Sequence, residues 1–237
     1  IRLVVITLGA LTIIVAVMMA MVQHSGRRLL GYHAVSQVGY MIMGVGSGSA
    51  LAFAGGLFHL VNNTLYKSNL FLSLGSVEKR AGSHDLDDLG GLARNMPATF
   101  VMALVGALSI SGVPPFNGFY SKWMIYQGLL EKAAGLTRGY AVWLLVCFVL
   151  AVFGSALTLA SFMKFLHAVF LGRRPDRLEK VGEAPANQWL ATGALAVLCA
   201  GFGLFAAKVP LRFFILPAAA GSGFVAPTFP GFYDPGL

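Results

Sequence analysis

The sequence has few charged residues and only two cysteines. Asp, Glu, Lys and Arg make up 11% of the 237 residues, whereas 57% are hydrophobic. Soluble domains carry about 25% charged residues, so this chain has too little polar surface to face water on all sides. Cys147 and Cys199 lie far apart inside apolar runs, which excludes a disulfide framework and a cysteine-held metal or iron–sulfur centre. The composition predicts a membrane protein without a metal or a resident cofactor.

Six apolar stretches are long enough to cross a bilayer, which takes about 20 apolar residues each. They cover residues 3–22, 29–46, 51–76, 97–130, 140–165 and 188–207. The fourth would measure about 50 Å as one continuous helix, and it contains Pro114-Pro115, through which a regular helix cannot continue. We expect a single crossing with a broken helix there; an extramembrane turn at the prolines is the alternative. The predicted fold class is all-α, a polytopic transmembrane helix bundle.

The last thirty residues are apolar but do not contain a stretch that could cross a bilayer. Five prolines interrupt them: Pro210, Pro217, Pro227, Pro230 and Pro235. We expect this tail to lie at the membrane interface or on its outer side.

The net charge of +8 does not indicate nucleic acid here, because most basic residues fall in short loops between apolar runs. Nine Lys and Arg residues lie in loops 23–30, 77–96 and 172–186, against five at the other ends of the helices. The positive-inside rule therefore predicts that these three loops are cytoplasmic and that the N-terminal end lies outside. The expected location is the inner (cytoplasmic) membrane, with several crossings.

Three lysines fall inside the predicted spans: Lys67, Lys122 and Lys164. A charged residue at the centre of a membrane helix costs about 2.5–3.5 kcal/mol on insertion scales. Lys164 lies near the end of its helix, as does His167, so both can extend toward water. Lys67 and Lys122 need another explanation.

His59, Asn63 and Lys67 recur every four residues, which places them on one face of the third predicted helix. Burial disfavours the charged form of a lysine, and a change in a neighbouring charge can restore it, as a proton relay requires. The alternative is a polar contact that only orders neighbouring helices. Lys122 follows the Pro114-Pro115 break, and an ionisable residue at a broken helix is a recurring design for ion sites.

Three motifs resemble those of the antiporter-like proton-pumping subunits found in respiratory complex I, Mrp-type sodium/proton antiporters and membrane-bound hydrogenases. Residues 27–41, RRLLGYHAVSQVGYM, are similar to the family pattern K/R-R-L-L-A-Y-S-T-I-S-Q-x-G-Y-M. Residues 59–72 resemble H-x3-H-x3-K-x2-L-F-L, and residues 114–122 resemble the end of G-I-P-P-x-x-G-F-F-S-K. The three motifs occur in the family's order, which makes the resemblance specific.

The resemblance implies one five-helix antiporter-like repeat with a discontinuous helix over residues 1–171, followed by a further helix at 187–207 and the Pro-rich tail at 208–237, all in one transmembrane domain. It also implies that Lys67 is the central relay lysine, that Lys122 is the terminal lysine at the broken helix, and that His59 is a relay or gating partner. Asn63 stands where the family pattern has its second histidine, and an amide cannot hold a proton. The family's first repeat is not found in this sequence, so we expect a fragment or one piece of a split subunit.

The resulting functional hypothesis is a proton-translocating membrane subunit of an energy-converting oxidoreductase complex, either hydrogenase-like or similar to NADH:quinone oxidoreductase. Its expected partners are other membrane subunits, the lipid bilayer and protons. Two alternatives stay open: an Mrp-type sodium/proton antiporter subunit, and a structural membrane module whose lysines only support packing.

Overall fold

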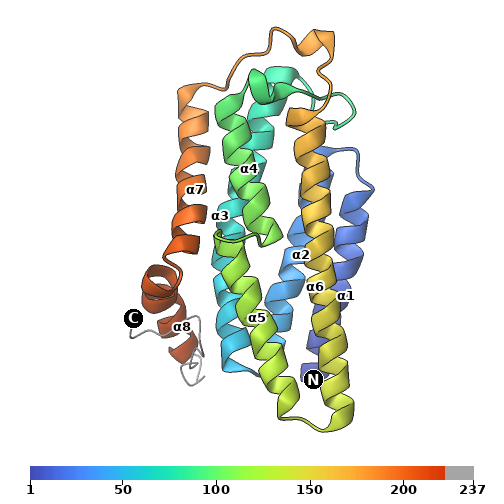
Figure 1. The fold of residues 1–237 in the computed structure, drawn as a ribbon, viewed down its shortest axis with the longest axis vertical. Helices are drawn as coiled ribbons and strands as arrows, with labels where there is room; N and C mark the ends of the chain where they lie inside the picture. Colours follow the sequence, from blue (N-terminus) through green and yellow to red (C-terminus); the bar gives the residue numbers. More distant parts are fainter. Residues whose placement is uncertain (222–237) are drawn as a thin grey trace.

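A computed structural model describes residues 1–221, and these residues form a bundle of long helices. The helices are α1 Arg2–Met21, α2 Gly26–Gly46, α3 Ala50–Ala81, α4 Pro97–Ser111, α5 Asn117–Ala134, α6 Arg138–Leu166 and α7 Ala186–Leu204. They run along the long axis of the molecule, and α4 and α5 follow one another end to end instead of lying side by side (Figure 1). The predicted all-α bundle is confirmed.

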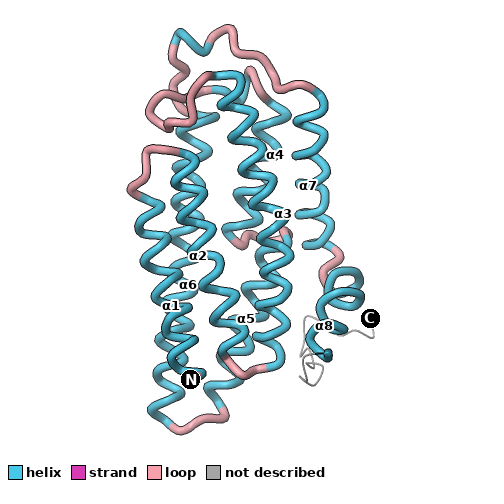
Figure 2. Tube along the Cα trace, turned by 180° about the vertical axis from the view of Figure 1, so that it is seen from behind, coloured by secondary structure: helices cyan, strands magenta, loops and turns pink. Residues whose placement is uncertain are grey.

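The break in the fourth predicted crossing lies between α4 and α5, at mid-height of the bundle (Figures 1 and 2). Gly112 ends α4 with φ of +80°, a conformation that glycine adopts without steric cost. Pro114 and Pro115 then supply no N–H groups to continue the helix. The irregular backbone is covered by α7, where a β-carbon on Gly203 would collide with the backbone of Pro115. Protein atoms thus surround the break, as irregular backbone at membrane depth requires.

Length and hydropathy alone identify three of the described helices as candidate membrane spans. These are α1, the stretch Arg138–Leu171, which is α6 with the π-helical turn that extends it, and α7. The intervening helices α2 and α3 carry buried polar side chains along their length: His33, Ser36 and Gln37 on α2, and His59, Asn62, Lys67 and Asn69 on α3. The central helices are therefore less apolar than those at the periphery.

Three loops meet at one end of the bundle, the upper end in Figure 1. Gly26 donates its backbone N–H to the carbonyl of His84 at 2.9 Å, and Asn95 donates its side-chain amide to the carbonyl of Val181 at 2.7 Å. Glu183 accepts the backbone N–H of Ala98 at 2.8 Å and so caps the first turn of α4. The three loops predicted to share one side of the membrane therefore do lie together.

The third helix is longer than the sequence predicts. The expected span ends at residue 76, whereas α3 continues through residues 77–81 and is terminated by Gly82 at φ +75°. Glu78 in this last part of α3 pairs with Arg27 of α2 at 2.7 Å. The Arg27–Glu78 contact stabilises the helical conformation of residues 77–81, which the sequence analysis assigns to a loop.

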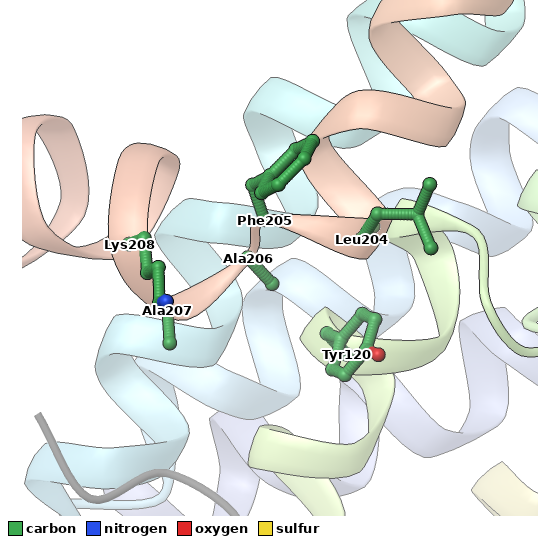
Figure 3. A pocket seen from close by; sticks show the side chains of 7 residues that line it. Tyr120, Leu204, Phe205, Ala206, Ala207 and Lys208 are labelled. Carbon is green, nitrogen blue, oxygen red and sulfur yellow. The ribbon is translucent and has the colours of Figure 1, made fainter. Parts of the chain in front are cut away.

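The tail is helical as far as the structure describes it. A π-helical turn, Ala207–Ile215, is followed by the short helix α8, Leu216–Gly221. Leu211 and Ile215 pack in one core cluster with Leu51 and Phe58 of α3. At the bend after α7, residues 203–208 and Tyr120 line a cavity of about 290 Å³ (Figure 3). Pro227, Pro230 and Pro235 lie outside the described residues.

Candidate functional site

Lys67 and Lys122 are buried, with 6% and 2% of their surface exposed. Among residues 1–221 no other lysine, arginine, aspartate or glutamate is buried, and neither lysine forms an ion pair. A buried charge without a countercharge is expensive, so each ammonium must be stabilised by neutral groups.

Lys67 extends from α3 to α2. Its Nζ donates a hydrogen bond to the carbonyl of Leu30 at 2.7 Å. The same nitrogen lies 5.9 Å from the ring centre of Phe71 and 6.0 Å from that of Phe162 on α6. Aromatic faces attract cations, so two rings and one carbonyl replace the missing carboxylate.

Lys122 binds the end of the broken helix. Its Nζ donates to the carbonyl of Ile110 at 2.8 Å. In a continuous helix that carbonyl would accept the N–H of residue 114, but Pro114 has none. The C-terminus of a helix also carries partial negative charge, which favours an ammonium there. The ring of Tyr40, centred 4.8 Å from Nζ, covers the other side of the charge.

A cavity of about 380 Å³ opens beside Lys122, between α5 and α6. Trp123, Tyr126 and Phe148 supply much of its lining, and Ser155 adds a hydroxyl that bonds Tyr126 at 2.8 Å. Of the two buried lysines, Lys122 is the one that lines this cavity.

His59 is placed so that both of its ring nitrogens have partners. Nδ1 lies 2.9 Å from the hydroxyl of Ser121, and Nε2 lies 3.1 Å from the amide oxygen of Gln37. A protonated ring can donate to both, because the Ser121 hydroxyl can in turn donate to the carbonyl of Gly118 at 3.2 Å. If the ring loses the proton on Nδ1, Ser121 can rotate and donate back to it. These contacts therefore accommodate both protonation states of His59.

The structure brings His59 close to Lys122 but not to Lys67. Tyr40 contacts both members of the first pair, with its ring centre 5.5 Å from that of His59. By contrast, His59 and Lys67 are eight residues apart on α3, about 12 Å along the helix axis. Asn63 lies between them, half-buried, and its Oδ1 has no hydrogen-bond partner among the described residues.

Sequence reasoning missed the contribution of α2. This helix provides the carbonyl for Lys67, the amide for His59 and the aromatic ring for Lys122, from Leu30, Gln37 and Tyr40. The spacing of these residues, seven and then three, is that of one helix face. The pattern was present in the sequence, but only the packing of α2 against α3 shows that the face is turned inward.

Lys164 differs from the other two lysines. Its side chain is exposed, and Nζ donates to the carbonyls of Met21 and Gln23 at 2.9 and 3.0 Å. It caps the C-terminus of α1, where a cation is favourable.

The family of the chain follows from a comparison with known families. The family described as NADH:quinone oxidoreductase/Mrp antiporter, transmembrane, matches residues 1–158. The chain belongs to this family. It is a multi-pass membrane protein.

Individual relatives come from several kinds of complex. The chain is 35% identical to formate hydrogenlyase subunit 3 of Escherichia coli K12 over 207 residues, covering 82% of this chain and 34% of that protein. It is 36% identical to a chain of the membrane-bound sulfane sulfur reductase, an archaeal respiratory membrane complex, with a TM-score of 0.77 over 85% of this chain and 32% of that one.

An Mrp complex from Dietzia sp. DQ12-45-1b has an equally similar fold, with a TM-score of 0.77 and 25% identity, covering 89% of this chain and 45% of that one. The chain thus spans about a third of the hydrogenlyase and reductase subunits, and somewhat less than half of the Mrp chain.

Proposed function

We propose that this chain is the proton-conducting part of a membrane subunit in an energy-converting oxidoreductase complex. The observation that carries this proposal is the pair of buried lysines without countercharges, one at a broken helix and the other on the adjacent helix face, in a chain of this family. Each lysine is held by a carbonyl and aromatic rings, so it can lose its proton without breaking an ion pair.

In the proposed path, Lys67 and Lys122 are the two proton-holding ends and His59 lies next to Lys122. His59 exchanges a proton toward Lys122 through its hydrogen bond to Ser121, the residue that precedes this lysine. Asn63 takes the role of a hydrogen-bonding neighbour on the same face of α3. A charge arriving on one lysine favours the neutral form of the next, which moves the proton onward.

We further propose that residues 1–171 act as one antiporter-like repeat, to which the helix at 187–207 and the Pro-rich tail at 208–237 are additions. The partners proposed are other membrane subunits, because the similar solved chains come from multi-subunit membrane complexes. The charge distribution supports an inner-membrane location with the end at which the three basic loops meet in the cytoplasm.

The test uses inverted vesicles containing the complete complex, with proton uptake followed by a pH-sensitive dye. In one arm electrons are supplied by hydrogen or NADH; in the other no donor is added and a sodium gradient is imposed. Uptake driven by electron donors supports the oxidoreductase reading. Uptake driven only by the sodium gradient assigns the chain to an antiporter instead. If neither treatment moves protons, the structural-module alternative is correct.

A further inference from the structure

His33 on α2 is a buried histidine that the path described above does not use. Its Nε2 lies 2.8 Å from the hydroxyl of Ser161 on α6, and its ring packs on that of Phe162 with centres 4.7 Å apart. The other ring nitrogen, Nδ1, is buried and has no hydrogen-bond partner among the described residues. With Nε2–H donated to Ser161, Nδ1 presents a lone pair that can accept a proton.

His33 lies on α2 between the residue that contacts Lys67 and the residue that contacts His59. Three residues earlier, the carbonyl of Leu30 binds Lys67; four residues later, the amide of Gln37 binds His59. These three residues lie on one face of α2, so His33 falls opposite the stretch of α3 that separates Lys67 from His59.

Lys67 and His33 share a neighbour as well as a helix face. The ring of Phe162 packs against His33, and its centre lies 6.0 Å from Nζ of Lys67. Within residues 1–221, α6 contributes a hydroxyl and an aromatic ring to this environment and no ion pair.

We infer that His33 carries the proton between Lys67 and His59, across the gap that Asn63 leaves on α3. The Lys67 ammonium releases one proton and becomes an amine, while His33 takes it on Nδ1 and becomes an imidazolium. The imidazolium then passes one proton toward His59 and returns to neutral. Buried polar atoms of His33, Gln37 and Asn63 lack protein partners in the described residues, and such atoms are the groups that buried water molecules bind.

The sequence motifs agree with this role. In the family pattern that residues 27–41 resemble, serine stands at the position of His33; in the pattern of residues 59–72, histidine stands at the position of Asn63. This chain therefore has a histidine on α2 in place of one on α3. The inference rests on the proposed proton-conducting function and adds a residue to its path.

The test is His33→Gln in the complete complex, assayed for proton uptake per turnover in vesicles. Glutamine keeps a side-chain amide that can bond Ser161, but it has no group that titrates. We expect uptake to fall roughly a hundredfold or more, the lower end of what a positioned proton-transfer group contributes. His24→Gln is the matched control: His24 is exposed in the loop after α1, so uptake is expected to be unchanged.

Restoring proton uptake with a second substitution distinguishes a proton-relay role of His33 from a packing role. Adding Asn63→His to His33→Gln places a titratable ring in the same gap from α3, and we expect most of the uptake to return. If His33→Gln does not assemble, His33→Asn, whose side-chain amide is shorter and also does not titrate, is assayed in its place with the same expectations.

Two results would overturn the inference while leaving the proposed function intact. One is normal uptake in His33→Gln while Lys67→Ala, measured in parallel, is inactive; the other is a loss that Asn63→His does not restore. Normal uptake in Lys67→Ala itself would instead contradict the proposed function, and the role of His33 would fall with it.

Discussion

At the scale of the residue, the molecule holds two ammonium groups in its interior by the same device. Each Nζ donates to a backbone carbonyl, at 2.7 Å for Lys67 and 2.8 Å for Lys122, and faces aromatic rings. A carboxylate at these positions would hold the charged form permanently. Neutral partners leave the protonation state responsive to nearby charges, which a relay needs and a static helix contact does not.

Asn63→His tests how tightly the face of α3 around residue 63 is packed. Asn63 is half-buried and its Oδ1 has no partner in the described part of the chain, so a histidine there replaces no existing side-chain oxygen contact. We expect normal assembly and proton uptake at least equal to that of the parent complex, measured in the same vesicle preparation.

Loss of assembly in Asn63→His would mean that this face is packed too tightly to contain water. The control is Thr64→His, one position further along α3 on an exposed side chain, which is expected to assemble normally.

At the scale of the element, the sequence predicts helices better than it predicts their contacts. Apolar length locates the crossings, and Pro114-Pro115 locates the break, because both signals are local. The end of α3 was misplaced because its last turn is polar and is held by a partner on α2, Arg27. The role of Gln37 and Tyr40 on α2 was not predicted. Sequence spacing shows which residues share a helix face, but it does not show which other helix that face packs against.

The backbone conformation at the break predicts the effect of replacing Gly112 by alanine. At φ +80°, Gly112 has a conformation that costs an alanine about 1–2 kcal/mol, and a β-carbon there would lie 3.1 Å from Cδ of Lys122. We expect Gly112→Ala to lower the thermal stability of the purified complex and also to reduce proton uptake, since Lys122 must shift.

Gly75→Ala is the matched control for that substitution. Gly75 lies within α3 on an exposed face, and a β-carbon there meets nothing within 4 Å. Alanine is favoured over glycine in a helix interior by about 1 kcal/mol, so stability is expected to hold or rise. Equal effects of the two substitutions would argue against a special role for the backbone at Gly112.

At the scale of the whole molecule, the arrangement has two distinct ends with polar side chains along the interior between them. The three basic loops join at one end through backbone and side-chain hydrogen bonds, and the α2–α3 and α5–α6 turns lie at the other (Figure 1). The buried lysines lie between these ends, one held by α2 and the other at the break.

The orientation in the membrane can be tested by labelling in intact cells. Cys147 and Cys199 are buried and are first replaced by alanine, after which one cysteine is introduced at Ser83 or at Thr137, in the loops at opposite ends. A membrane-impermeant maleimide is expected to label Thr137→Cys and to leave Ser83→Cys unlabelled. The reverse pattern would place the basic loops outside and contradict the proposed topology.

The most direct test of the proton path is the number of protons moved per turnover when each buried lysine is replaced. In the assembled complex, Lys67→Ala and Lys122→Ala are each expected to abolish coupled proton uptake. Lys164→Ala, which removes an exposed lysine of α6 that caps the end of α1, is expected to leave it unchanged. Normal uptake in both Lys67→Ala and Lys122→Ala would show that the buried lysines serve packing, and that protons do not pass along this path.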